Sequence, residues 1–262
     1  MTTTATDSKL TRLLLGIDGP VASITLRNPP LNVIDICMME EIAQVVAEIE
    51  ALPRVSVLIL TAEGNVFSAG VDVAAHARDK VEEMLSKFHG VIRSLVAAKK
   101  VTIASVHGLC LGGAAELAMI CDLVYTSEDA EWGFPEIKLG CYPPVACTAL
   151  AALVGQKRAA EMILTGRSIT GREAVEIGLA TRAVPGPQLS SALEAGVAQL
   201  LHLSPAALAI AKKASYAWDS MHFDKGLARA EKIYLEDLMK TSDAQEGIGA
   251  FLEKRRPKWS GQ

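Results

Sequence analysis

Residues 106–116 read Val106-His107-Gly108-Leu109-Cys110-Leu111-Gly112-Gly113-Ala114-Ala115-Glu116, and they join a predicted strand to a predicted helix. The preceding run, residues 101–106, is apolar and β-branched, which indicates a buried strand. Residues 114–122 contain strong helix formers and no Gly or Pro, which predicts a helix. A glycine pair at such a junction lets the backbone approach a ligand closely and leaves the first N–H groups of the helix without partners. The junction can therefore bind an electrophile, with the carboxyl group of Glu116 one turn inside the helix.

This stretch alone leaves two interpretations open. In the first, the glycines only make a tight turn, and Glu116 only faces the positive end of the helix dipole. In the second, that dipole, roughly half an elementary charge, favours negative charge that develops on a bound ligand. Evidence from the rest of the chain has to decide between a structural and a catalytic junction.

The composition predicts one α/β unit with a self-sufficient core. A chain of 262 residues is long enough to bury roughly 70–75% of its extended surface. Hydrophobic residues make up 50% of the chain and aromatic residues only 5%, which is typical of aliphatic helices packed on a sheet. The net charge of −4 leaves no basic excess to neutralise phosphates, so we expect no nucleic acid as the main partner.

The cysteines and the N-terminal segment predict a cytoplasmic protein. The five cysteines are odd in number and lack the CxxC or nearby His spacing of a zinc site, so we expect buried reduced thiols and no metal. Residues 1–9 are polar and lack the regions of a signal peptide. No uninterrupted run of about 18 apolar residues follows, so we expect no membrane span.

The first half of the chain predicts alternating strands and helices. Asp18-Gly19-Pro20 separates two short apolar runs, which indicates a β-hairpin. Asp35 is a suitable N-cap for the helix that follows, and Pro53 ends it. The expected strands are 10–17, 21–27, 55–60, 101–106 and 123–126, and the expected helices are 35–52, 79–98 and 114–122.

From Pro143 onward the pattern predicts almost only helices. Thr170 and Glu173 have the spacing of a capping box at a helix start. The expected helices are 145–153, 157–164, 171–177, 189–203, 205–218, 222–240 and 242–253. We therefore expect a catalytic core over residues 1–185 and a helical region over residues 186–262.

A second glycine-containing junction lies at residues 63–72. It follows a buried strand and precedes a helix, so its backbone N–H groups could also point at a ligand, or it could be an ordinary loop with Asp72 as N-cap. Farther along, Glu136 follows a proline in the loop 132–136, and such a Glu is usually solvated. Its neighbours Trp132 and Phe134 are apolar, which favours a partly desolvated carboxyl group with a raised pKa.

Several common catalytic motifs are absent from the sequence. It contains no GxSxG elbow, no GxGxxG after the first strand, no GxxxxGK[ST] loop and no HExxH. The five histidines are scattered, and a lone histidine is more often a core or capping residue than a base. Nucleotide hydrolysis and zinc chemistry are therefore not expected, and the two junctions and two glutamates remain.

Three segments in this order carry a resemblance to a known family. They are residues 67–72 (FSAGVD), 107–118 (HGLCLGGAAELA) and 134–140 (FPEIKLG), and residues 28–32 and 246–255 extend the match. The chain resembles the crotonase, or enoyl-CoA hydratase/isomerase, family over nearly its whole length. The resemblance implies an α/β crotonase fold of repeated ββα units with a C-terminal helical region that forms trimers.

The resemblance also implies an activity. An acyl-CoA thioester would be bound with its carbonyl oxygen on the backbone N–H groups of Ala69 and Gly113, and this pair would stabilise an enolate. Glu116 and Glu136 match the two catalytic glutamates of hydratases, which hold one water as acid and base. Which glutamate takes which role stays open. Substrate-binding positions would be Ser68, Gly70, Asp72, Gly112, Tyr142 and Pro143.

The same resemblance implies a homotrimer or homohexamer and no cofactor beyond the coenzyme A of the substrate. A departure from the common hydratase pattern lies at residues 140–147, where Pro143 and Pro144 replace glycines and stiffen the wall of the acyl pocket. This segment and residues 29–35 are similar to hydratases of cyclohexa-1,5-diene-1-carbonyl-CoA. The alternatives are a straight-chain enoyl-CoA hydratase, an enoyl-CoA isomerase, and a scaffold or nucleic-acid-binding homologue without activity.

Overall fold

Six strands form one mixed sheet in the computed structural model, which describes residues 10–261 apart from the side chains of residues 216–221. The strand order is β1-β2-β3-β4-β6-β9; β1 and β2 form the predicted antiparallel hairpin and the other neighbours are parallel. The strands are β1 (Leu13–Asp18), β2 (Val21–Leu26), β3 (Val57–Ala62), β4 (Val101–Val106), β6 (Leu123–Ser127) and β9 (Arg182–Val184). Every residue of β4 is buried, as expected for a central parallel strand covered on both faces.

A second, smaller sheet includes part of the junction at residues 106–116. It consists of β5 (Leu109–Leu111), β7 (Glu131–Gly133) and β8 (Ser168–Thr170), in that order. Long strand, short strand and helix therefore follow one another twice, as β4, β5 and α3 (Gly113–Met119), and again as β6, β7 and α4 (Pro144–Val154). This is the ββα repeat of the expected crotonase fold.

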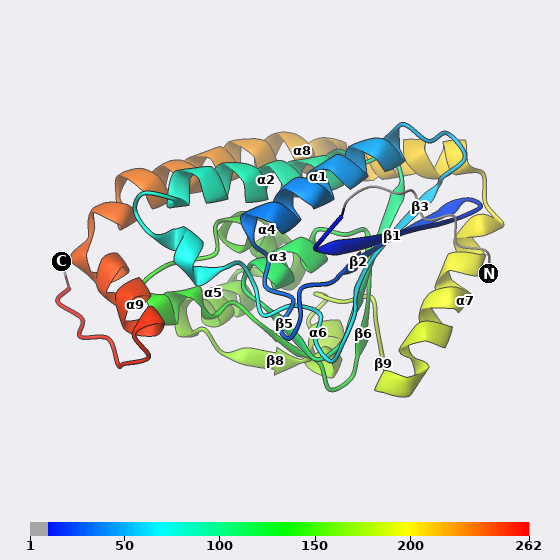
Figure 1. Cartoon of the computed structure of the whole chain (residues 1–262). Helices are drawn as coiled ribbons and strands as arrows, with labels where there is room; N and C mark the ends of the chain where they lie inside the picture. Colours follow the sequence, from blue (N-terminus) through cyan, green and yellow to red (C-terminus); the bar gives the residue numbers. More distant parts are fainter. Residues whose placement is uncertain (1–9, 262) are drawn as a thin grey trace.

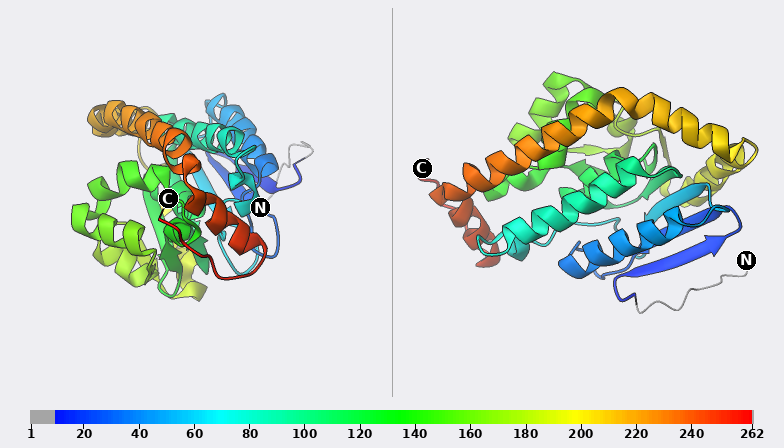
Figure 2. Two further views of the ribbon diagram at one scale, coloured as in Figure 1. Left: turned by 90° about the vertical axis from the view of Figure 1, so that its left-hand side faces the viewer. Right: turned by 90° about the horizontal axis from the view of Figure 1, so that it is seen from above.

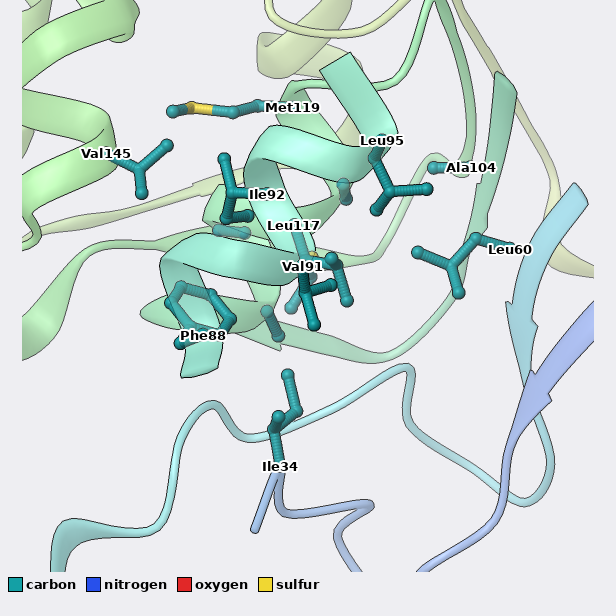
Figure 3. Close-up of a cluster of buried hydrophobic side chains, with 14 of the residues drawn as sticks. Ile34, Leu60, Phe88, Val91, Ile92, Leu95, Ala104, Leu117, Met119 and Val145 are labelled. Atoms are coloured by element: carbon teal, nitrogen blue, oxygen red, sulfur yellow. The ribbon is translucent and has the colours of Figure 1, made fainter. Parts of the chain in front are cut away.

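Three long helices run side by side along one side of the molecule (Figures 1 and 2). They are α1 (Ile36–Glu50), α2 (Val81–Ala97) and α8 (Pro205–Glu236), and α2 lies between the other two. Helix α2 buries Leu85, Phe88 and Ile92, which recur at helical spacing. Figure 3 shows Phe88 and Ile92 in the cluster that joins α2 to α3 and to the sheet. The side chain of Phe88 thus packs against the first turn of α3.

The remaining helices complete the second half of the chain. They are α5 (Gln156–Thr165), α6 (Gly171–Glu176), α7 (Leu189–Leu201) and α9 (Ser242–Leu252), with the 3-10 turns η1 (Val73–His76), η2 (Pro135–Leu139), η3 (Gly186–Gln188) and η4 (Leu238–Lys240). The predicted capping box is present, because the Thr170 side chain accepts from the Glu173 N–H and the Glu173 side chain accepts from the Thr170 N–H. Asp35 likewise caps α1 by accepting from the Met38 N–H at 2.8 Å.

The structure corrects three expectations for the second half. Residues beyond Pro143 contain β8 and β9, and the loop 132–136 contains the end of β7 and the start of η2. Strands of three residues are too short to show an alternating pattern, so the sequence does not reveal them. Residues 205–236 form one helix where the sequence predicted two.

The five cysteines are free thiols, as predicted, but they are not all buried. Cys147 on α4 is exposed and Cys37 is half-buried, because helix periodicity turns these positions away from the core. Among the described side chains, those of residues 10–215 and 222–261, no group of three His, Cys, Asp or Glu could hold a metal ion. No single helix in the described part of the chain is long and apolar enough to cross a membrane. The segments Gly186–Leu201 and Pro205–Ser215 reach the required length and hydropathy only when they are taken as a pair, and the bend between them is 102°.

Candidate functional site

The two glycine-containing junctions of the sequence lie against each other. Backbone hydrogen bonds join them: the Phe67 N–H donates to the His107 carbonyl at 2.8 Å, and the Ser68 N–H donates to the Leu109 carbonyl at 2.9 Å. Gly70 has a φ of +105°, and a Cβ atom there would lie 2.8 Å from the Leu111 carbonyl oxygen. Only glycine allows this approach, so the sequence places it where the two backbones meet.

The glycine pair at the start of α3 is equally constrained. Gly112, the N-cap residue, has a φ of +55°, and a Cβ atom on it would lie 2.7 Å from Oε1 of Glu136. A Cβ atom on Gly113 would lie 2.6 Å from Cγ2 of Val71. The pair therefore brings the first turn of α3, the loop at Val71 and the Glu136 carboxyl group into contact.

The backbone N–H groups correct one sequence assignment. The N–H of Ala69 donates to the Leu31 carbonyl at 2.9 Å, so it is not free for a ligand. Val71 forms a parallel bridge with Ile34, whose own N–H and carbonyl bond to the residues on either side of Val71. The N–H of Val71 therefore points to the opposite side, and it has no acceptor among residues 10–261. The sequence put this donor two residues too early.

Gly113 agrees with its sequence assignment as a residue with a free donor. It is the first residue of α3, and the first N–H groups of a helix have no acceptor within the helix. No other acceptor for this N–H lies within the described part of the chain. Val71 and Gly113 thus present two free N–H groups from loops in contact.

A small cavity of about 70 Å³ lies at this contact. Eight of the ten site residues that the sequence singled out line it: Ala69, Gly70, Gly112, Gly113, Glu116, Glu136, Tyr142 and Pro143. Ser68 and Asp72 are not part of the lining. Their side chains hold the loop instead, because Ser68 Oγ accepts from the Gly70 N–H at 3.0 Å and Asp72 Oδ1 accepts from the Ala74 N–H at 3.0 Å.

Glu116 reaches the cavity from α3. Its side chain is buried, and Oε1 accepts from the Ala146 N–H in the first turn of α4 at 2.9 Å. Burial raises the pKa of Glu116 from 4.5 to about 7, although the Ala146 N–H stabilises the charged form. The group can therefore exchange a proton near neutral pH.

Glu136 reaches the cavity from η2. Its Oε2 atom is shielded from solvent and has no hydrogen-bond partner among the described residues. Burial and the negative charge of Glu116 both raise the pKa of Glu136, and a bond from its own backbone N–H only partly opposes this. The apolar neighbours in the sequence predicted this direction. The two carboxyl groups share one site, with Glu136 the more firmly protonated.

The wall of the cavity comes from residues 142–144. The Tyr142 hydroxyl donates to the Ala230 carbonyl of α8 at 2.6 Å, and Pro144 opens α4. Tyr142 also borders a larger apolar groove of about 970 Å³ that α4, α5 and α8 line. Tyr142 thus borders both the cavity that the two glutamates line and a groove that neither of them lines.

Three polar lining residues were not singled out by the sequence. His76 is the last residue of η1, and burial lowers the pKa of its imidazole. His89 lies on α2 and Tyr234 on α8, and both are fully buried at the cavity. His89 lies among the apolar residues of a predicted helix. The sequence pattern there does not distinguish a histidine in the core from a histidine in a site.

The chain has relatives among known proteins. Residues 16–262 match the model of the family described as enoyl-CoA hydratase/isomerase. The chain belongs to the enoyl-CoA hydratase/isomerase family. It is accordingly an enzyme of the enoyl-CoA hydratase type, a hydro-lyase, with the crotonase fold.

Individual relatives span the whole chain. The cyclohexa-1,5-dienecarbonyl-CoA hydratase of Thauera aromatica is 34% identical over 245 residues, which cover 94% of this chain and 95% of that protein. The 2,3-dehydroadipyl-CoA hydratase of Escherichia coli (strain K12) is also 34% identical and covers 95% of each chain. Among solved structures, an enoyl-CoA hydratase from Mycobacterium avium subsp. paratuberculosis K-10 superposes with a TM-score of 0.87 at 27% identity, over 96% of this chain and 99% of that one.

Proposed function

We propose that this enzyme adds water to a conjugated enoyl-CoA or dienoyl-CoA thioester through an enolate. The observation that carries the proposal is the meeting, in one cavity, of two free backbone N–H groups and two buried glutamates with raised pKa values. Such a set serves a reaction that builds negative charge on one oxygen while protons move at two neighbouring carbons. No cofactor beyond the coenzyme A of the substrate takes part.

In this proposal the N–H groups of Val71 and Gly113 bind the thioester carbonyl oxygen. Both loops are fixed by backbone hydrogen bonds and by glycines that admit no side chain, so the donors are oriented before the substrate arrives. Donors held in this way stabilise an enolate oxygen more than a neutral carbonyl, because they need no reorganisation as charge develops.

The environments of the two glutamates support an assignment of their roles. Glu116 receives a hydrogen bond from the Ala146 N–H, which favours its ionised form, so it is the base that takes a proton from water. Glu136 lies beside that charge with an unpaired oxygen, so it is the protonated acid. The hydroxide oxygen bonds to the conjugated carbon, and Glu136 then transfers its proton to the α-carbon of the enolate.

For the acyl group we propose the ring of cyclohexa-1,5-diene-1-carbonyl-CoA. The cavity is small, and Tyr142 and the two prolines line it, which suits a compact acyl group more than an extended chain. The similarity to the Thauera aromatica hydratase supports the same substrate. A straight-chain enoyl-CoA is the alternative that substrate tests must separate.

We also propose that residues 186–262 are the region through which the chain forms a trimer or a dimer of trimers. Apolar side chains on α8 and α9 are exposed in the single chain, including Ile210, Phe251 and Leu252. Light scattering coupled to size-exclusion chromatography measures the mass directly. A monomer at micromolar concentration would contradict this part of the proposal.

The central test replaces each glutamate by glutamine. Glu116→Gln and Glu136→Gln should each lower hydration by about 10²–10⁴-fold, because each removes one proton transfer, whereas acyl-CoA binding measured by calorimetry persists. Glu82→Gln, at an exposed position in the first turn of α2, is the matched control and should change neither quantity. Unchanged turnover in both active-site variants would contradict the proposal.

Substrate and reaction type need separate measurements. Turnover of ring and straight-chain enoyl-CoA thioesters under equal conditions ranks the acyl groups, and ring preference is the expected result. Reaction in ¹⁸O-labelled water distinguishes hydration from isomerisation, because only hydration puts labelled oxygen into the product. A chain that binds none of these thioesters would instead support a scaffold homologue.

A further inference from the structure

Two buried polar groups at the catalytic cavity have no role in the hydration step. Buried side-chain nitrogen and oxygen atoms without a hydrogen-bond partner are few in the described part of the chain, and three of them belong to residues that line this cavity. One is Oε2 of Glu136, which the reaction uses. The others are Nε2 of His89 and the hydroxyl group of Tyr234. Buried polar atoms are normally paired, so two unpaired atoms at one cavity point to a ligand.

His89 is held in a single orientation. Its side chain is fully buried on α2, and its Nδ1 lies 2.7 Å from Oε1 of Glu231 on α8. Arg93 donates to the same Oε1 at 2.9 Å, which keeps this carboxylate in place. A carboxylate can only accept, so Nδ1 carries a hydrogen, and Nε2 is the ring nitrogen left without a partner. Glu231 thereby fixes the ring orientation.

Tyr234 supplies the complementary donor. Its side chain is 1% exposed on α8, and its ring lies 5.1 Å from the ring of Tyr142. The thiol of Cys141 is a hydrogen-bonding group beside this hydroxyl, and it is a weak partner. Two residues that line the cavity thus each carry a polar atom without a strong partner, in addition to the catalytic glutamates.

We propose that His89 and Tyr234 bind a hydroxyl group on the acyl part of the thioester, and that Glu231 positions His89 for this contact. An alcohol donates to Nε2 and accepts from the Tyr234 hydroxyl, which satisfies both atoms at once. The inference rests on the proposed function and names its substrate class. The hydroxyl is either the one that hydration adds at the β-carbon or one that the substrate already carries farther along.

Two alternatives lack support from this arrangement. A hydrocarbon acyl group would leave both atoms unpaired, and sites built around such atoms discriminate against ligands that lack the partner. A carboxylate end group would place a further negative charge beside Glu116 and Glu136, which line the same cavity. A hydroxyl group is the substituent that fits both.

The test measures preference for hydroxylated thioesters by calorimetry on the full chain. The ring series is cyclohexanecarbonyl-CoA with its 2-, 3- and 4-hydroxy derivatives, and the chain series is butanoyl-CoA with its 3- and 4-hydroxy derivatives. At least one hydroxylated thioester should bind about 10-fold more tightly than its parent. A preference for the 2-hydroxy ring or 3-hydroxy chain identifies the added hydroxyl, and a preference for the others identifies a distal one.

Variants assign this preference to residues. His89→Phe and Tyr234→Phe should each abolish most of it, while the affinity for the parent thioester changes less than about threefold. Glu231→Ala should reduce the preference, and Glu231→Gln, which keeps an acceptor for Nδ1, should restore it. Ser127→Ala removes another buried unpaired hydroxyl outside the cavity and is the matched control, with the preference intact.

The outcomes separate this inference from the proposed function. If but-2-enoyl-CoA is hydrated but no hydroxylated thioester is preferred, or if the preference survives in both Phe variants, only the present inference is overturned. If no thioester of either series binds, the proposed function itself fails. Should His89→Phe not fold by circular dichroism, Tyr234→Phe and Glu231→Gln decide.

Discussion

At the scale of single residues, Gly113 is a position where space alone requires glycine. It has an ordinary negative φ, so its requirement for glycine comes from space and not from conformation. The atoms that would meet a Cβ belong to Val71 at 2.6 Å and Phe88 at 3.1 Å. Val71 carries the other free N–H group, so any side chain at position 113 would push the two donors apart.

We predict that Gly113→Ala lowers the rate of hydration by about 10²–10³-fold, the usual cost of losing one oxyanion donor. The loss should appear in kcat more than in KM, because the donors act on the enolate more than on the bound substrate. Steady-state kinetics with the preferred thioester measures both. Gly249→Ala in α9, where a Cβ meets nothing within 4 Å, is the control and should keep full activity. A variant at position 113 with normal kcat would contradict the role of this N–H group.

A second residue-scale prediction concerns pH and stability. The pKa of Glu116 is 4.5 in the unfolded chain and about 7 in the folded one, so between these values the unfolded chain is ionised while the native state keeps its proton. The stabilisation from this group is full below pH 4.5 and is lost as pH rises through 7, on the order of 3 kcal/mol in total. Glu116→Gln removes this dependence.

The stability of Glu116→Gln relative to the natural protein should therefore increase between pH 4 and pH 8. Urea unfolding at several pH values measures this difference, and any fixed effect of the amide group cancels in the comparison. Glu82→Gln, at its exposed position, should show no such trend. A difference that is the same at both pH values would show that Glu116 titrates normally in the native state.

Single residues also show how far the sequence predicts the site. Both glutamates and Gly113 follow from motifs, because side-chain chemistry and helix starts can be read directly from the chain. The choice between Ala69 and Val71 cannot, because it depends on which N–H group already has an acceptor: the Ala69 N–H donates to the Leu31 carbonyl, and no acceptor for the Val71 N–H lies in the described part of the chain. Residues two apart in a regular strand point their N–H groups to the same side, so the difference comes from the tertiary pairing of the loop and not from its local pattern.

At the scale of elements, the long helices and strands follow from hydrophobic period, and the short strands do not. β5, β7 and β8 have three residues each, fewer than any alternating pattern requires. These strands nevertheless fix the site, since β5 leads into Gly112 and β7 leads to Glu136. The predicted wall at residues 142–144 is present as an element boundary, with Pro144 as the first residue of α4.

The third prediction concerns Tyr142, in the wall of the cavity. Tyr142→Ala should connect the cavity with the apolar groove of about 970 Å³, because the Tyr142 ring borders both spaces. We expect the ratio of turnover with oct-2-enoyl-CoA to that with but-2-enoyl-CoA to rise by about 10-fold or more. Tyr142→Phe keeps the ring and loses only the bond to the Ala230 carbonyl, so it should leave the ratio unchanged. Equal ratios in all three proteins would show that Tyr142 does not limit acyl length.

At the scale of the whole molecule, the site depends on segments far apart in the chain. The motifs predict the fold and the cavity, but the contact between His89 and Glu231 joins positions 142 residues apart and has no sequence signal. Long-range pairs of this kind arise from how α2 and α8 pack, which propensity and spacing do not encode. A second long-range pair, Lys212 with Asp122, links α8 to the core.

Lys212 on α8 forms this ion pair with Asp122, the residue before β6. Their charged atoms lie 2.7 Å apart with side chains only 8% and 13% exposed, and Lys212 also donates to the Lys100 carbonyl at 2.9 Å. Removing one partner of a buried pair leaves the other charge uncompensated, so Lys212→Met should lower the free energy of unfolding by about 3 kcal/mol. The double variant with Asp122→Asn should recover part of this loss, because no lone charge remains buried.

Urea unfolding of the two single variants and the double variant gives the coupling free energy directly. Lys232→Met is the matched control on the same helix: its pair with Glu236 spans 3.8 Å with both side chains largely exposed, and its loss should change stability by less than about 0.5 kcal/mol. Because α8 carries Glu231 and Tyr234, loosening its anchor should also weaken thioester binding. Equal stability of the Lys212 and Lys232 variants would mean that apolar packing alone holds α8, and the ion pair would then be a consequence of docking and not its cause.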